Sequence, residues 1–203
     1  RRAEMDRAVF YAILARIWGF AAGPVSALLI AAKFTPITQG FYFTFGSVVA
    51  LQAFAELGIG FAVTQFASHE WAHLGIGKDG RVEGDSYSLT RLASLAQIAL
   101  KWYSAAAVVV IAGLSIGGYL FFSQSPTQDV GWKLPWISLC VLTGMNLFSI
   151  AIWSLLEGCN QVSNVYFYRF FQGVSGSVAA WCAILLGADL WTASIMSLVG
   201  LVY

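Results

Sequence analysis

Long, nearly uninterrupted apolar runs alternate with short polar stretches along this chain of 203 residues. Strands of a membrane β-barrel would instead alternate apolar and polar residues over about ten positions. Most of these runs are close to the roughly 20 residues that a helix needs to cross a bilayer. The pattern therefore predicts an all-α polytopic membrane protein. We expect six apolar helices, at about residues 9–32, 40–67, 102–122, 136–156, 167–188 and 190–203.

The last of these runs has about 14 residues, too few to cross a bilayer as a helix. The chain also begins with Arg1 rather than Met. We therefore expect residues 1–203 to form a single transmembrane lobe, truncated in its sixth helix. Residues 68–91 are rich in glycine and charge and predict a loop, and the amphipathic residues 91–102 are expected to extend the third helix.

Composition agrees with this class and narrows the function. The chain is 59% hydrophobic and 10% charged, whereas soluble domains carry about 25% charged residues. Its net charge of +1 offers no concentrated basic surface for nucleic acid. The three cysteines, an odd number without metal-type spacing, are expected to be reduced packing residues. We expect no metal and no cofactor.

The distribution of Lys and Arg predicts the orientation, because cytoplasmic flanks of membrane helices are enriched in these residues. With the N-terminus in the cytoplasm, Lys33 and Lys133 fall outside and Arg16 lies within the membrane. The loop at 68–91 is then cytoplasmic. The remaining cations all fall at cytoplasmic flanks: Arg1, Arg2, Arg7, Lys78, Arg81, Arg91, Lys101 and Arg169.

Arg16 is the charge that stands deepest in an apolar run. A charge in the membrane costs at least about 2.5–3.5 kcal/mol and usually faces a bundle interior or a wet cavity. Gly19, Gly23 and Ala27 share its helical face, and small residues let helices approach, so we expect this face to pack inward. The alternative is an arginine that extends its side chain back to the headgroups.

The second segment carries Gln52, Glu56 and Gly60 at a helical spacing of four. Glu56 lies about 15 Å from the cytoplasmic end of that segment, close to the predicted depth of Arg16. Three roles are open for Glu56: a structural ion pair with Arg16, a coupling site for a proton or sodium ion, or a substrate contact.

The fourth and fifth segments add further polar groups. Asn146 and Glu157 lie on one face of the fourth helix, and Arg169 is followed by Gln172 and Gly173 in the fifth. Glu157 and Arg169 are expected at the inner mouth of the lobe. They form either an ion pair at the interface or a binding site for a substrate headgroup.

One motif suggests a different chemistry. His69, Glu70 and His73 match H-E-x-x-H, in which two histidines bind zinc and the glutamate activates water. A hydrolytic zinc site needs a third protein ligand. These are the only two histidines in the chain, and the motif falls at the membrane exit of the second segment. A membrane metalloprotease is therefore an alternative rather than the leading hypothesis.

Five short stretches together resemble the oligosaccharide flippases of O-antigen and exopolysaccharide assembly, within the multidrug/oligosaccharidyl-lipid/polysaccharide exporter superfamily. They are residues 15–20 (ARIWGF), 35–40 (TPITQG), 56–60 (ELGIG), 155–158 (LLEG) and 160–162 (NQV). The related peptidoglycan-precursor flippases carry a second arginine soon after the first. Ala22 and Gly23 stand in that place here, which argues against that substrate.

The resemblance implies two six-helix lobes around a central cavity, of which this chain is most of the first. It implies a multi-pass protein of the bacterial cytoplasmic membrane that flips undecaprenyl-pyrophosphate-linked oligosaccharide by alternating access, without being an enzyme. Membrane lipids, and a proton or sodium ion, are the other expected partners. A cation-coupled multidrug exporter of the same superfamily is the alternative. The residues expected to bind substrate or couple transport are Arg16, Gln52, Glu56, Asn146, Glu157 and Arg169.

Overall fold

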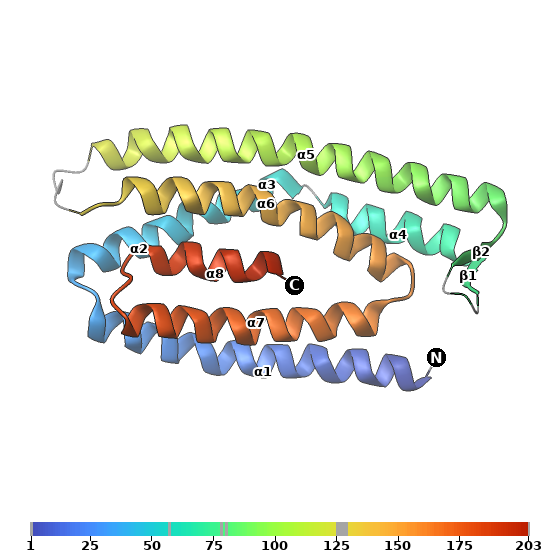
Figure 1. Ribbon diagram of the computed structural model, residues 1–203, viewed down its shortest axis with the longest axis horizontal. Helices are drawn as coiled ribbons and strands as arrows, with labels where there is room; N and C mark the ends of the chain where they lie inside the picture. Colours follow the sequence, from blue (N-terminus) through green and yellow to red (C-terminus); the bar gives the residue numbers. More distant parts are fainter. Residues whose placement is uncertain (1, 57, 78, 80, 125–129, 203) are drawn as a thin grey trace.

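The computed structural model describes residues 2–56, 58–77, 79, 81–124 and 130–202. It is built of helices and one small antiparallel hairpin, so the all-α class is confirmed (Figure 1). In chain order the elements are α1 (Arg2–Lys33), α2 (Pro36–Val49), the 3-10 turn η1 (Ala50–Gln52), α3 (Ala53–Glu56), α4 (Ile59–Trp71), β1 (Leu74–Ile76), β2 (Val82–Gly84), α5 (Ser86–Ser123), α6 (Lys133–Gly158), α7 (Val162–Leu185) and α8 (Trp191–Val202).

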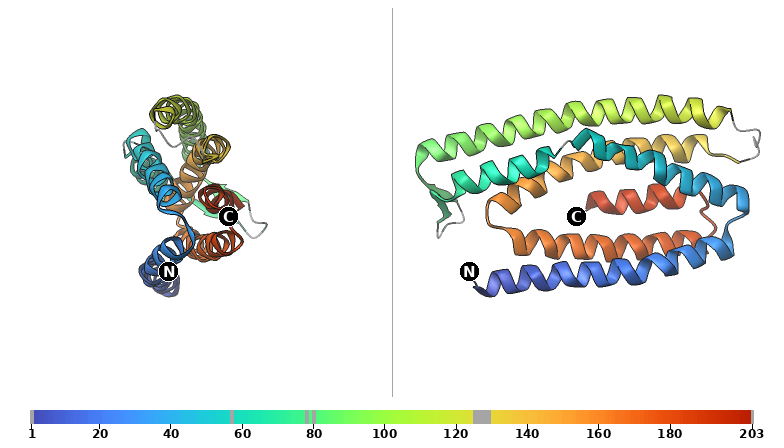
Figure 2. Two further views of the ribbon diagram at one scale, coloured as in Figure 1. Left: turned by 90° about the vertical axis from the view of Figure 1, so that its left-hand side faces the viewer. Right: turned by 180° about the vertical axis from the view of Figure 1, so that it is seen from behind.

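The long helices run roughly along one common axis, in alternating directions, as Figures 1 and 2 show. The N-terminus, the hairpin β1–β2 and the α6–α7 turn lie together at one end, which we call the hairpin end. The α1–α2 and α7–α8 connections, the end of α5 and the start of α6 lie at the opposite end. Arg7, Arg81 and Arg91 belong to the hairpin end, and Lys33 and Lys133 to the opposite end. Arg1 and Lys78, also used to predict the orientation, lie outside the described residues.

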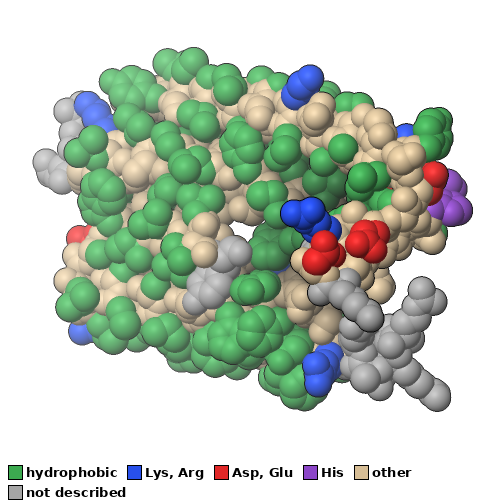
Figure 3. Space-filling model, turned by 45° about the vertical axis from the view of Figure 1, so that its right-hand side comes forward, with side chains coloured by type: hydrophobic (Ala, Val, Ile, Leu, Met, Phe, Trp, Pro, Cys, Tyr) green, Lys and Arg blue, Asp and Glu red, His purple; other side chains and the backbone are tan. Residues whose placement is uncertain are grey.

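Three helices are long and apolar enough to cross a membrane: Arg7–Lys33, Ser86–Ser123 and Lys133–Gly158. A fourth span results if the bent pair Pro36–Glu56 and Ile59–Trp71 is counted as one. These helices indicate a membrane protein. Hydrophobic side chains cover most of the face in Figure 3, whereas most of the visible Asp, Glu and His side chains gather towards the hairpin end.

The second apolar segment differs from the single helix expected at 40–67. It bends by 42° between α3 and α4. Gly58 precedes α4 with a φ of +73°, a left-handed conformation that ends a helix easily only where no Cβ is present. Gln52, Glu56 and Gly60, which the sequence placed on one continuous helical face, are therefore divided between η1, α3 and α4.

Helix α5, by contrast, is longer than the third apolar segment. It runs without a break for 38 residues, about 57 Å, and includes the amphipathic extension at 91–102. Asp85 caps it: the Ser88 N–H donates to Oδ2 at 2.9 Å, and this backbone hydrogen bond lowers the pKa of the Asp85 carboxyl.

The larger of the two buried hydrophobic clusters among the described residues lies where α2, α5 and α6 meet. Phe45, Phe122 and Trp136 are buried there, with ring centroids about 5 Å apart in edge or tilted arrangements. Gly118 leaves the space that the Trp136 indole fills. This cluster fixes α6, one wall of the groove described next.

Candidate functional site

A groove of about 440 Å³ opens between η1, α6, α7 and α8, and we call it the central groove. Its polar lining comes from residues far apart in the sequence: Gln52, Thr143, Asn146, Arg169, Gln172 and Ser197. Three residues predicted as site residues, Gln52, Asn146 and Arg169, are thus brought together. Gly173, Gly176 and Gly200 also line the groove, and because they have no side chains they leave space in it.

Two amide side chains of this groove hold α8 in place. The Asn146 Nδ2 donates to the Ser197 Oγ at 2.9 Å and to its carbonyl oxygen at 3.2 Å. The Gln172 Nε2 donates to the Gly200 carbonyl at 2.6 Å. These donors are occupied by the protein itself. Among the described residues, the side chains of Gln52 and Thr143 make no hydrogen bond, so these two polar groups of the groove are available to a ligand.

Arg169 is the charged residue in the lining of the central groove. Its Nη1 lies 2.9 Å from the Glu157 Oε1, and its guanidinium lies 5.7 Å from the centre of the Tyr166 ring. The side chain of Arg169 is 39% exposed and that of Glu157 is 21% exposed. Helix α7 begins at Val162, so Arg169 lies about 10 Å inside the helix rather than at its start. Arg169 therefore lies deeper along its helix than the sequence predicted, and Glu157 pairs with it from the end of α6.

A second groove, the side groove, lies beside the central one and has a volume of about 350 Å³. It runs between α1 and α7, and Arg169, Gly173 and Met196 line both grooves. Two indole–hydroxyl hydrogen bonds fasten these helices. The Trp18 Nε1 donates to the Ser177 Oγ at 3.3 Å, and the Trp181 Nε1 donates to the Ser26 Oγ at 2.8 Å.

Arg16 does not lie on a packed face, contrary to expectation. Helix α1 packs on α7 through a different stripe that includes Trp18 and Ala22, while Arg16 is exposed. Gly19 and Gly23 line the side groove, and a Cβ added to either would meet nothing within 4 Å. The small residues beside Arg16 therefore border open space.

Glu56 ends α3, directly before the bend of the second segment, and is half-buried. Within the described part of the chain no ion pair links it to Arg16, and α1 makes its extensive contact with α7 rather than with α3. The structure thus separates two residues that the sequence placed at similar depth on neighbouring helices.

The central groove also contains residues that the sequence did not single out. Thr143 adds a buried hydroxyl from α6, and Ser197 and Gly200 come from α8. The sequence contained a weak signal, because Ser194 and Ser197 stand three residues apart in an apolar helix. The sequence predicts this segment only as an incomplete span.

The H-E-x-x-H residues adopt a different arrangement from a hydrolytic zinc site. The Glu70 side chain is 7% exposed, and its Oε1 accepts from the Arg91 Nε at 3.1 Å. The carboxylate that would have to activate water therefore anchors the end of α4 to the start of α5. The His69 side chain is 72% exposed, and its ring centre lies 6.3 Å from that of His73.

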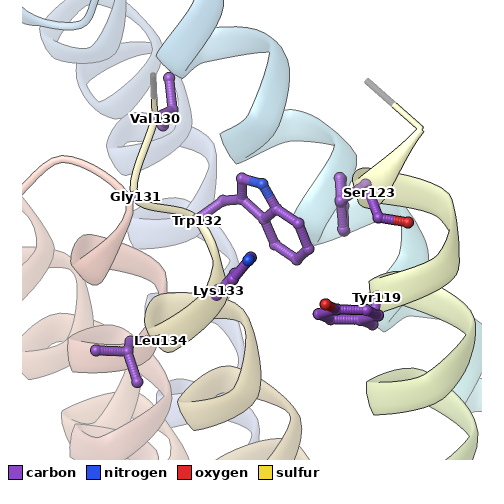
Figure 4. Close-up of a pocket in the computed structure, with 8 residues that line it drawn as sticks. Tyr119, Ser123, Val130, Gly131, Trp132, Lys133 and Leu134 are labelled. Carbon is purple, nitrogen blue, oxygen red and sulfur yellow. The ribbon is translucent and has the colours of Figure 1, made fainter. Parts of the chain in front are cut away.

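A larger pocket, of about 520 Å³, lies at the opposite end between α5 and α6 (Figure 4). Tyr119, Trp132 and Lys133 line it, with the Lys133 Nζ 6.0 Å from the centre of the Tyr119 ring. Aromatic and lysine side chains at a helix end are typical of the membrane interface. This pocket is separate from the residues that the sequence predicted as site residues.

Comparison of the chain with models of protein families, with curated proteins and with solved structures found no match.

Proposed function

We propose that this protein is a flippase, which moves lipid-linked oligosaccharide across the bacterial cytoplasmic membrane by alternating access. In this proposal the chain supplies one lobe of a two-lobe transporter, with the hairpin end in the cytoplasm. The substrate is an undecaprenyl-pyrophosphate-linked oligosaccharide destined for the cell surface. The protein performs no covalent chemistry.

The observation that carries the proposal is the charge of the central groove. A polar groove in an apolar helical protein is suited to a polar ligand, and Arg169 is the charge in its described lining. A guanidinium can hold two phosphate oxygens at once, which suits a pyrophosphate. Glu157 balances Arg169 while the groove is empty of substrate, and a phosphate can replace that carboxylate.

Arg16 supports the same proposal from α1. It lies about 14 Å beyond Arg7, where the span begins, and it is exposed. An arginine at that depth is costly against lipid, so its surroundings in the membrane are expected to be a wet cavity or another part of the transporter. The oligosaccharide and pyrophosphate would pass through such a cavity.

One observation favours the alternative, a cation-coupled exporter. Discontinuous membrane helices often bind coupling ions, and Glu56 stands at the bend between α3 and α4. A proton or sodium ion at Glu56 is compatible with either transporter. The cationic central groove favours an anionic substrate, and hence the flippase.

The test is replacement of Arg169 in the intact protein. We expect Arg169→Gln to lower flipping at least about tenfold, the value of one charge-assisted hydrogen bond, and Arg169→Lys to restore only part of it. Lys101→Gln, an exposed cation on α5, is the control. The measurements are surface polysaccharide in a flippase-deficient cell and movement of lipid-linked oligosaccharide in proteoliposomes, at matched membrane levels.

Normal flipping by Arg169→Gln would overturn the proposal. The alternative predicts a different result, in which Arg169→Gln stays active and Glu56→Gln removes the dependence of export on a proton or sodium gradient.

A further inference from the structure

A third pocket, which we call the end pocket, lies at the hairpin end and has a volume of about 330 Å³. Four separate segments enclose it: the start of α1, the end of α4, strand β1 and the α6–α7 turn. Its side chains include Arg7, Trp71, Asn160, Gln161, Ser163 and Asn164. Neither the central groove nor the side groove shares these residues.

The chemistry of the end pocket suits a phosphate ester. Arg7 is exposed and supplies a guanidinium, and no Asp or Glu is among the described residues that line the pocket. Ser163, Asn160 and Asn164 add hydroxyl and amide groups. The Asn164 Nδ2 donates to the Gln161 Oε1 at 2.7 Å, which holds these two side chains together on one wall.

The position of the end pocket indicates where its ligand comes from. Arg7 opens the first candidate span, Trp71 ends α4, and the turn from Cys159 to Gln161 separates α6 from α7. All three lie near the ends of apolar helices, and in a membrane protein such helix ends lie at the depth of the lipid headgroups. Tryptophan is enriched at that depth, and basic residues there attract anionic lipids.

We propose that the end pocket binds the phosphate of an anionic phospholipid headgroup, with Arg7 as the cation and the amides of the α6–α7 turn as donors to the glycerol side. Trp71 then lies beside the upper part of the acyl chains. This site is independent of the proposed flippase activity, since its residues are separate from both grooves.

The experiment measures lipid retention by the intact protein in native mass spectrometry. Mixed micelles contain phosphatidylglycerol or, as the neutral comparison, phosphatidylcholine. We expect the wild type to retain phosphatidylglycerol preferentially, and Arg7→Gln to weaken retention about tenfold, since one charge-assisted hydrogen bond is lost. Ser163→Leu, which fills the pocket while keeping Arg7, should weaken it as well.

The matched control is Arg81→Gln. Arg81 is also exposed at the hairpin end, but its Nε lies 3.8 Å from the Asp79 Oδ2 and it is not part of the end pocket. Equal loss in Arg7→Gln and Arg81→Gln would show unspecific charge attraction and overturn the proposal. Millimolar inorganic phosphate should not displace the lipid; displacement would identify a site for soluble anions and overturn the assignment to a lipid.

Discussion

Two glycines of α5 and α6, Gly118 and Gly158, lie in opposite surroundings from two glycines of α1 and α7, Gly23 and Gly173. A Cβ added at Gly118 would overlap the Trp136 indole, and one added at Gly158 would overlap the Ala67 Cβ and lie 2.8 Å from the Thr64 carbonyl oxygen. At Gly23 and Gly173, an added Cβ would meet nothing within 4 Å. The first group permits close helix packing, and the second borders the grooves.

The two regions also differ in how much of each helix is covered. In the most apolar part of each span, 39% of α6 is buried but only 11% of α1. Membrane helices associate mainly by van der Waals packing, because lipid is as apolar as their side chains. Helix α6 is therefore the more completely packed of these two spans, while α1 leaves most of its surface uncovered, which gives room for the proposed substrate or second lobe.

The largest effect on stability is expected from Gly158→Ala, which tests the close packing of α4 against α6. The Thr64 Oγ1 donates to the Ser154 carbonyl at 3.0 Å, so these two helices cannot separate without losing a hydrogen bond. Because the added methyl would meet the Ala67 Cβ and the backbone of α4, neither of which can rotate away, we expect a loss of about 1–3 kcal/mol in unfolding free energy. Thermal or denaturant unfolding in detergent measures it. An unchanged stability would show that the helices are not tightly packed at Gly158.

The same contrast explains how far the sequence alone could lead. Hydropathy over 20-residue windows identified an apolar helical protein, but of the six predicted segments only three, or four if the bent pair is counted as one, are long and apolar enough to cross a membrane among the described residues. The Arg169–Glu157 pair was expected as one of two alternatives. Helical periodicity could not show that Gly19 and Gly23 face open space whereas Gly118 and Gly158 do not, because packing and groove glycines have the same spacing. That distinction depends on which helix is the neighbour.

Arg16 and Glu56 do not pair because α1 packs against a different helix from the one that the sequence suggested. The sequence suggested that consecutive segments pack together, which would have placed these two residues side by side. Instead α1 packs on α7, through Trp18 and Trp181, and the bend near Gly58 redirects the end of the second segment. Neither the long-range pairing of helices nor the bend follows from hydropathy, because both depend on side-chain fit in three dimensions.

A smaller effect on stability is expected from loss of the ion pair between Glu157 and Arg169. Arg169 lines both grooves, so this pair lies outside the closely packed contacts of Gly118 and Gly158. Because Arg169 is 39% exposed, solvent screens the pair and the coupling should not exceed about 1 kcal/mol. A double-mutant cycle of Glu157→Gln and Arg169→Gln, read by unfolding in detergent, measures it. A coupling of several kcal/mol would identify the pair as a structural element of a closed core and not as part of an accessible groove.

The smallest change in stability is expected at Gly173. Substitution there tests most directly whether the glycines of α7 border open space. This residue lines both grooves in the middle of α7. Gly173→Ala should leave the fold unchanged or stabilise it by up to about 1 kcal/mol, because alanine favours a helix over glycine. Gly173→Leu should keep the stability but lower flipping several-fold, because its side chain occupies the space beside Arg169.

Gly117 in α5 is the matched control: it is exposed, an added Cβ there also meets nothing within 4 Å, and it lies away from the grooves. Gly117→Leu should therefore leave both stability and flipping unchanged. If Gly173→Leu unfolds the protein, the surface around α7 is packed rather than open. If it folds and flips normally, neither groove carries the substrate.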